Sequence, residues 1–177
     1  MGRSNEWFMR VHGEHDDDDG YDAYLTELSE KRFVAEHTIK DEYIKGMKIK
    51  DLFPVIWRAS TEILDGLEVQ VVIDGNNDIH VSSGSAGYVD FQIDPVGMKL
   101  PIRCWIHTHP FGSAYFSGTD RRTVKTWQLL MEEAYVLGGV EHYGHWVQDN
   151  PYELDVYREG GFLDFTQRWE ENGSEII

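Results

Sequence analysis

An apolar run that ends in two histidines constrains the fold of this 177-residue chain more than any other stretch. Residues 101–106 are apolar with little interruption, which is typical of a buried strand. Side chains two positions apart on a strand point the same way, so His107 and His109 are predicted to share one face at the strand end. Pro110 cannot donate to a sheet ladder and is predicted to end the strand.

A loop and then a helix are predicted to follow Pro110. Apolar residues recur there at helical spacing, namely Val124, Trp127, Leu130 and Met131. The helix is therefore expected to start near Thr119, and the loop can return Asp120 towards the two imidazoles. Two histidines and one carboxylate make a zinc site of the catalytic type, with the fourth position left for water.

Simpler interpretations of the same residues stay open. Ser117 and Asp120 have the spacing of a helix capping box, with Asp where Glu or Gln is usual. Two histidines separated by one residue can also be chance neighbours at a strand end. The joint pattern, H-x-H-P followed by six residues and S-x-x-D, is far more specific than its parts.

This joint pattern resembles the signature of the JAMM (MPN+) metalloproteases, which remove ubiquitin and ubiquitin-like proteins. Residues 104–120, CWIHTHPFGSAYFSGTD, are most similar to the AMSH-type deubiquitinases, and the resemblance covers roughly residues 44–150. It implies an α/β (α+β) fold of the MPN/JAMM-like, cytidine-deaminase-like kind, in which helices flank a central mixed β-sheet.

The resemblance also implies a role for each residue of the signature. His107, His109 and Asp120 would bind Zn2+, and Ser117 would donate a hydrogen bond to the oxyanion of the reaction. The expected activity is that of a zinc-dependent isopeptidase or peptidase, which hydrolyses amide bonds at the C-terminal tail of ubiquitin or a ubiquitin-like protein. The expected partners are therefore ubiquitin or ubiquitin-like conjugates.

Members of this family need a glutamate as general base, at the start of a strand that follows the first helix. Glu68 fits that position, with Gly75 seven residues later as in the family. Glu62 is the competing candidate, but it lies in the preceding helical pattern. This half of the match is weaker, because Gln70 and Val71 replace the glycine- and cysteine-type residues usual in that strand.

Three alternatives to a deubiquitinase are kept. The chain could be a metal-free MPN scaffold, although all five site residues are present. It could be a JAMM-type hydrolase of another small protein, such as a sulfur carrier or a phage tail protein. It could also be a non-catalytic interaction module with an acidic surface. Residues 84–100 are short for the helix that relatives place there, and the cysteine of the AMSH-type second zinc site is missing.

Composition narrows the class of protein. The length and the 41% hydrophobic content predict a single globular domain. A net charge of −16 argues against binding to a phosphate backbone, but suits basic partners or high salt equally. The single cysteine, Cys104, excludes an internal disulfide and a cysteine-rich zinc site. No membrane-spanning run or signal peptide is recognised, so a cytoplasmic location is expected.

The chain is predicted to divide into an acidic, partly mobile N-terminal extension (1–43) and a catalytic domain (44–177). A short helix is expected from Asp22, whereas residues 33–39 fit either a helix or a strand. Aromatic residues at helical spacing near the C-terminus (Phe162, Phe165 and Trp169) predict a closing helix.

The middle of the chain gives a clear succession of elements. A strand is predicted at 45–50, and then a helix that Asp51 caps and that has Pro54 in its first turn. Gly66 is expected to stop this helix. Further strands are predicted at 68–73, 79–82, 88–93, 134–137 and 141–147. His80 is interpreted as structural, and a second metal site at His142 and His145 is judged improbable.

Overall fold

The computed structural model describes residues 18–84, 97–148, 153–158, 161–169 and 175–176. Its helical elements are α2 (Asp18–Glu42), η1 (Ile49–Leu52), α3 (Phe53–Arg58), η2 (Ala59–Ile63) and α4 (Gly118–Trp127). Its strands are β1 (Val69–Ile73), β2 (Ile79–Ser83), β3 (Ile102–Thr108), β4 (Met131–Leu137), β5 (His142–Val147), β6 (Glu153–Arg158), β7 (Gly161–Trp169) and β8 (Glu175–Ile176).

The strands form one mixed sheet in the order β2-β1-β3-β4-β5-β6-β7-β8. Strands β3 and β4 pair in parallel, and the other neighbouring strands pair antiparallel. Helix α4 makes the connection between the parallel pair, as a parallel crossover requires. The fold is thus mixed α/β, as predicted. None of the described helices has an apolar stretch long enough to cross a membrane.

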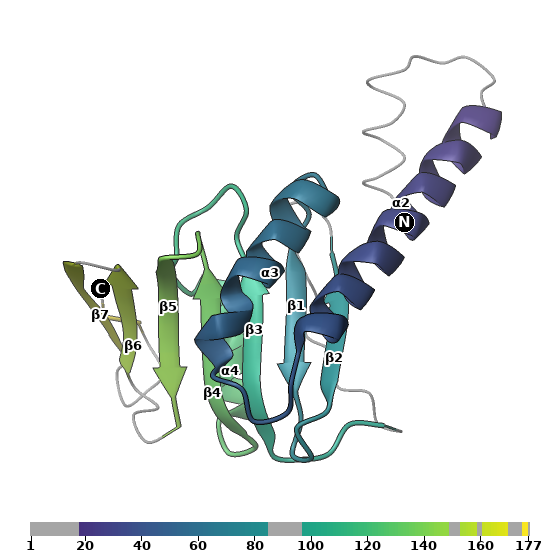
Figure 1. Ribbon diagram of the computed structural model, residues 1–177. Coiled ribbons are helices and arrows are strands. Elements are labelled where there is room, and N and C mark those ends of the chain that lie inside the picture. The colour runs from purple at the N-terminus through teal and green to yellow at the C-terminus, as the bar shows by residue number, and fades with distance from the viewer. Residues whose placement is uncertain (1–17, 85–96, 149–152, 159–160, 170–174, 177) are drawn as a thin grey trace.

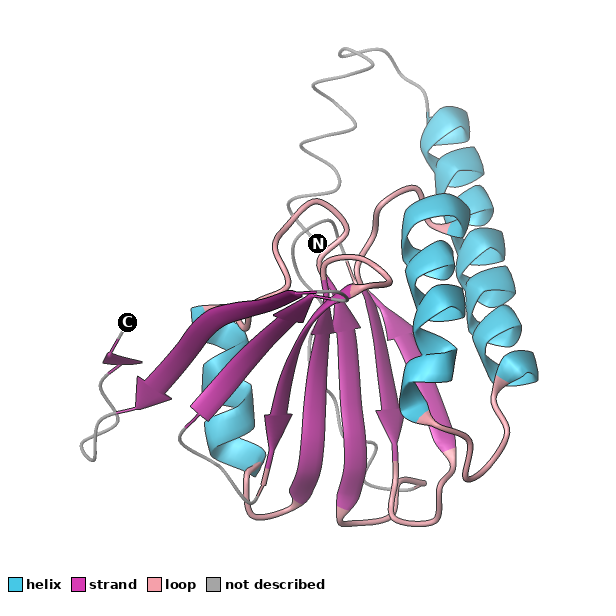
Figure 2. Cartoon of the chain, turned by 60° about the vertical axis from the view of Figure 1, so that its left-hand side comes forward, coloured by secondary structure: helices cyan, strands magenta, loops and turns pink. Residues whose placement is uncertain are grey.

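Helices cover both faces of the sheet (Figures 1 and 2). On one face, α2 and α3 pack against a core that includes Val71, Cys104 and Ile106. On the other face, α4 packs against a core that includes Val72 and Trp105. All five residues of β1 are buried because both faces of the sheet are covered.

The N-terminal region is helical throughout its described part. Helix α2 extends over 25 residues, and this settles the choice at 33–39 in favour of a helix. Ala35 and Ile39 of α2 are buried in this core, at the four-residue spacing of one helix face. The hydrophobic core therefore begins before the boundary expected at residue 44. The expected mobility of residues 1–17 concerns a segment outside the described residues.

The strand predicted at 45–50 is wrong. Gly46 has a φ of 84°, which breaks an extended backbone, and η1 already begins at Ile49. The predicted cap at Asp51 is wrong as well, because η1 continues into α3 and Asp51 N–H already donates to the Lys48 carbonyl. Pro54 does lie in the first turn of α3, as predicted.

The prediction of a C-terminal helix is also wrong, since residues 161–169 form strand β7. Leu163 and Phe165 are two apart, so the same stretch fits the period of a strand as well as that of a helix. Pairing along β6, where Val156 lies opposite Leu163, selects the strand. The strand predicted at 88–93 falls outside the described residues. The strands predicted at 68–73, 79–82, 134–137 and 141–147 are confirmed as β1, β2, β4 and β5.

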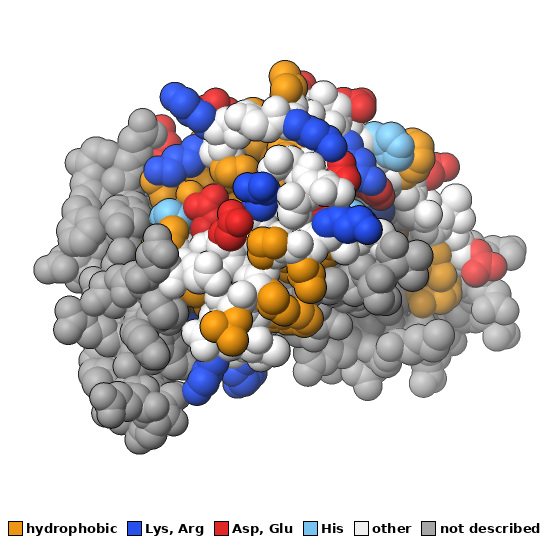
Figure 3. All heavy atoms as spheres, turned by 90° about the horizontal axis from the view of Figure 1, so that it is seen from below, with side chains coloured by type: hydrophobic (Ala, Val, Ile, Leu, Met, Phe, Trp, Pro, Cys, Tyr) orange, Lys and Arg blue, Asp and Glu red, His pale blue; other side chains and the backbone are white. Residues whose placement is uncertain are grey.

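The turn after β1 joins two segments at the end of the sheet where β1 finishes. Asp74 is fully buried and accepts hydrogen bonds from the main-chain N–H groups of Asn76, Asp78 and Lys99. Its Oδ2 also contacts His80 Nε2 at 3.1 Å, consistent with the structural role predicted for this histidine. Figure 3 views the molecule from this end and shows lysine and arginine side chains around a group of hydrophobic ones.

Candidate metal centre

The carboxyl end of β3 holds the two histidines of the signature. His107 lies within the strand, opposite Val136 of β4, and is almost fully buried. His109 follows the end of the strand, but its N–H still donates to the Leu137 carbonyl at 2.7 Å. Both imidazoles are therefore fixed through the backbone of the central parallel pair, as the alternation along the strand predicts.

The first turn of α4 brings Asp120 to the same place. One ligand atom from each of His107, His109 and Asp120 lies within 4.8 Å of the other two. His107 Nε2 is 3.1 Å from Asp120 Oδ1, and His109 Nε2 is 3.5 Å from Asp120 Oδ2. Two ligands of a tetrahedral zinc ion, each about 2.1 Å from the metal, are about 3.4 Å apart. The observed separations fit such a centre, so this group could hold a metal ion.

The hydrogen-bond pattern of the imidazoles also fits a metal. His109 Nδ1 lies 3.1 Å from the Ser113 carbonyl, to which it can only donate, and this leaves the Nε2 lone pair of neutral His109 available. His107 Nδ1 and Nε2 are buried, and neither makes a well-aligned hydrogen bond with the described residues; Nε2 has only the 3.1 Å contact with Asp120 Oδ1. A metal ion facing Nε2 would give this nitrogen a partner.

The metal-free site is strongly polarised. Burial raises the pKa of the Asp120 carboxyl, but attraction to a charged His107 and nearby hydrogen bonds outweigh it and hold the pKa well below its usual range. Burial lowers the pKa of His109, but Asp120 and, to a smaller extent, Glu68 raise it above its ordinary value overall. The metal-free site therefore favours an ionised Asp120 carboxylate beside the two imidazoles.

Ser117 is the N-cap of α4. The Asp120 N–H donates to Ser117 Oγ at 3.2 Å, and the Ser117 N–H donates to Asp120 Oδ2 at 2.6 Å, which completes a capping box. The structural interpretation of the S-x-x-D spacing is thus confirmed. It is compatible with catalysis, because the cap uses only a lone pair of the hydroxyl and does not consume its proton.

Glu68 directly precedes β1 and is buried, with 6% of its surface exposed. Gln70 pairs with His107 in the antiparallel ladder, so two residues further along the register Glu68 faces His109. The effect of Glu68 on the pKa of His109 agrees with this proximity. The competing candidate, Glu62, is exposed on η2. Burial and register both favour Glu68.

Sequence reasoning missed two residues that support His107. The Trp105 ring stacks on the His107 ring, with centroids 4.5 Å apart and an interplanar angle of 15°. Trp105 Nε1 donates to Gln70 Oε1 at 3.1 Å. Gln70 therefore holds in place the indole ring that stacks on a candidate metal ligand. The two-residue spacing of Trp105 and His107 was the available signal.

The loop between β3 and α4 forms one wall of the site. Its Ala114 lies against two glycines, since a Cβ on Gly138 would be 2.6 Å from Ala114 N and one on Gly144 would be 3.0 Å from Ala114 O. Phe111 (81% exposed) and Tyr115 (44% exposed) project from the same loop. The backbone of the loop is thus seated on β4 and β5. Phe116 of the same loop is buried, and the Phe111 ring lies against Gly66.

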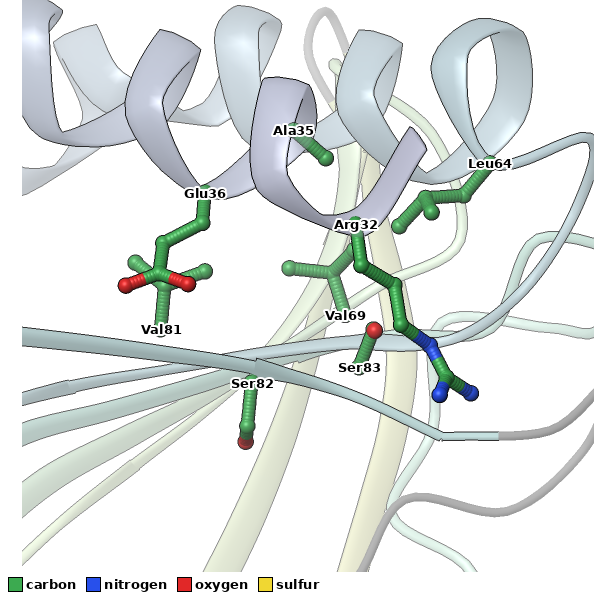
Figure 4. Close-up of a pocket in the computed structure, with 8 residues that line it drawn as sticks. All are labelled: Arg32, Ala35, Glu36, Leu64, Val69, Val81, Ser82 and Ser83. Carbon is green, nitrogen blue, oxygen red and sulfur yellow. The ribbon is translucent and has the colours of Figure 1, made fainter. Parts of the chain in front are cut away.

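Other polar groups lie apart from this centre. His145 contacts Glu133 Oε2 at 3.0 Å and stacks on Tyr135, whereas His142 is exposed. Within the described ranges, His107, His109 and Asp120 form the one group of three or more that could hold a metal. A cavity of about 200 Å3 lies between α2 and strands β1 and β2 (Figure 4). Its lining includes Val69 but none of the candidate ligands.

Comparisons of the chain with protein families, with curated proteins and with solved structures found no match.

Proposed function

We propose that this chain is a zinc-dependent isopeptidase or peptidase of the JAMM (MPN+) type, acting at the C-terminal tail of ubiquitin or a ubiquitin-like protein. The observation that carries the proposal is the convergence of His107, His109 and Asp120 at distances suited to zinc, with buried Glu68 opposite His109. Two imidazoles and one carboxylate are a ligand set typical of catalytic zinc.

Each residue has a defined task in this proposal. His107, His109 and Asp120 would hold the ion. When bound, it would act as a Lewis acid that polarises the substrate carbonyl and lowers the pKa of water. The Glu68 carboxylate accepts a proton from water and later passes it to the departing amine. The Ser117 hydroxyl donates to the oxygen on which negative charge develops. When the bond is an isopeptide, the amine that departs is a lysine side chain.

Substrate choice follows from the signature and from what surrounds it. An extended C-terminal tail is expected to bind mainly through its backbone, beside exposed Phe111 and Tyr115. Residues 84–100 are short for the helix that JAMM-type proteins place there. We therefore expect this chain to select weakly among acceptor lysines. Linear fusions and differently linked conjugates should be cleaved at rates within about tenfold of one another.

The test is to incubate the purified chain with a panel of ubiquitin and ubiquitin-like fusions and conjugates, with and without a chelator. Cleavage that the chelator abolishes and added zinc restores would support the proposal. Cleavage that resists the chelator would overturn the metal mechanism. Binding of conjugates without cleavage, in protein that contains zinc, would favour an interaction module. One linkage preferred by a thousandfold would refute the predicted weak selectivity.

A further inference from the structure

Two buried hydroxyl groups connect Glu68 to the strand that carries the histidines. Thr108 lies between His107 and His109, and its Oγ1 accepts a hydrogen bond from the Val69 N–H at 2.9 Å. The same Oγ1 is 2.8 Å from Ser60 Oγ, and Ser60 Oγ donates to the Leu67 carbonyl at 2.6 Å. Ser60 and Thr108 are both fully buried.

The donor in each of these hydrogen bonds follows from the two groups at the ends of the network, the Leu67 carbonyl and the Val69 N–H. The Leu67 carbonyl can only accept, so the Ser60 hydroxyl must donate to it. Ser60 Oγ must then accept from the Thr108 hydroxyl, and Thr108 Oγ1 in turn accepts from the Val69 N–H. Each hydroxyl has one donor and one acceptor role filled. A buried network that is satisfied in this way specifies one arrangement.

Leu67 and Val69 are the residues on either side of Glu68. The hydrogen-bond network therefore holds the backbone just before and just after the proposed base. Thr108, which belongs to the network, lies between the two proposed histidine ligands. The ladder between β1 and β3 ends at the pair of Gln70 and His107. Beyond that pair, the Thr108 side chain takes over from the main chain in holding Val69.

The helix that carries Ser60 is shaped for this contact. Element η2 is a π-helical turn in which the Leu64 N–H donates to the Ala59 carbonyl, five residues back. The Gly66 N–H then reaches the Ser60 carbonyl at 2.8 Å. Gly66 has a φ of 90°, a conformation that suits glycine. The wide turn thus folds the chain back so that Leu67 lies over the Ser60 hydroxyl.

We propose that Ser60 and Thr108 are positioning residues, which fix the Glu68 carboxylate relative to His107 and His109. The catalytic part of this inference rests on the proposed hydrolase function. A displacement of about 1 Å at a reacting group can cost about 100-fold in rate, so a small movement of Glu68 is sufficient to matter.

The key variants are Thr108→Val, which keeps the shape and removes the hydroxyl, and Thr108→Ser, which restores a hydroxyl. Thr61→Val is the matched control, because Thr61 also lies on η2 and its hydroxyl donates to the Trp57 carbonyl, away from Glu68. We expect Thr108→Val to lower kcat by about 10- to 100-fold with little change in KM or zinc content. Thr108→Ser should recover most of the loss, and Thr61→Val should stay close to wild type.

Two further readouts separate positioning from mere stability. In the metal-free protein, the titration of Glu68 followed by carbon NMR should shift in Thr108→Val but not in Thr61→Val. When Glu68→Gln is already present, Thr108→Val should cause little additional loss of rate, because the residue that it positions no longer acts.

Equal effects of Thr108→Val and Thr61→Val on kcat and on the Glu68 titration would overturn the inference. A wild-type protein that binds zinc but cleaves no conjugate would instead overturn the proposed function. In that case the Glu68 titration in the two threonine variants would still decide whether the network positions this carboxylate.

Discussion

Ser117 and Asp120 hydrogen-bond to each other twice, each through its own main-chain N–H to the side chain of the other. The capping box thereby sets the side-chain orientation of Asp120, which is also the carboxylate of the candidate metal centre. Helix initiation and ligand geometry are thus one structural unit. The two interpretations of the S-x-x-D spacing are complementary for this reason.

This unit predicts a double effect of Ser117→Ala. Loss of the cap should reduce the free energy of unfolding by about 1 kcal/mol. Loss of the hydroxyl donor should also lower turnover by about 10²- to 10³-fold if Ser117 stabilises the oxyanion. Thermal unfolding and initial rates measure the two effects separately. Ser113→Ala is the control, since Ser113 contacts His109 through its carbonyl, which the substitution keeps. A stability loss with unchanged turnover would leave Ser117 as a cap alone.

The metal centre predicts close to one equivalent of zinc per chain. His109→Gln should weaken zinc binding by more than the roughly 10- to 100-fold that follows loss of an outer hydrogen-bond partner, because it removes a ligand itself. His142→Gln, at an exposed histidine, should leave zinc content unchanged. Elemental analysis of protein purified without added metal provides the measurement. A content near zero that added zinc does not restore would contradict the metal centre.

The stacking of Trp105 on His107 predicts an optical signal for metal binding. Co2+ added to the metal-free protein should quench tryptophan emission, because the indole lies beside a ligand ring. Trp105→Phe should remove most of this quenching and keep an aromatic platform. Trp57→Phe should retain it, since Trp57 packs in the core on the other face of the sheet. Equal quenching in both variants would show that the metal binds elsewhere.

The base assignment predicts that Glu68→Gln leaves zinc bound and the fold intact, but lowers turnover by about 10²- to 10⁴-fold. Glu62→Gln, at an exposed position, should be close to wild type. Steady-state kinetics and zinc analysis of the two variants decide the question. An essential Glu62 and a dispensable Glu68 would reverse the assignment.

Asp74 predicts a pH-dependent contribution to stability. Burial raises the pKa of this carboxyl, but hydrogen bonds from Lys99, Asp78, His80 and Asn76 lower it below its ordinary value overall. Its stabilising effect should therefore be complete above the unfolded-state pKa of about 3.9 and be lost as pH falls through the lower folded-state pKa.

Asp74→Asn should accordingly cost about 1–3 kcal/mol at neutral pH, because it places an amide donor against other donors. The cost should shrink in acid, where the wild-type carboxylate itself takes up a proton. Thermal unfolding of both proteins from pH 7 to pH 2 measures the difference. Asp78→Asn, which alters a half-exposed ion pair with Lys45, is the control. A difference that stays constant down to pH 2 would contradict the assigned role.

The candidate metal ligands were predictable because their signal is local. Strand alternation places His107 and His109 together, and a short loop with a helix start returns Asp120 to them. Glu68 was harder, since its position depends on the pairing of β1 with β3, some 40 residues away. The contact between Ser60 and Thr108 has no sequence signal of its own, because neither hydroxyl belongs to a periodic pattern.

The C-terminal helix was wrongly predicted because the helical and the strand period both fit the same residues. Phe162 and Phe165 suited a helix, but β6 offered a pairing edge that single-sequence periodicity does not reveal. At 45–50, the left-handed conformation of Gly46 decided against an extended strand. Ala35 and Ile39 are buried, so the core includes part of the segment 1–43, which its acidic charge had suggested lies outside the domain.

The seating of Ala114 on Gly138 and Gly144 has an evolutionary consequence. Any side chain at either glycine would push the loop away from β4 and β5, so these positions tolerate little change. Tyr115, one residue further along the loop, meets no such restriction on its solvent side. Substitutions at Tyr115 should therefore change the surface beside the candidate metal centre and leave the seating of the loop backbone intact.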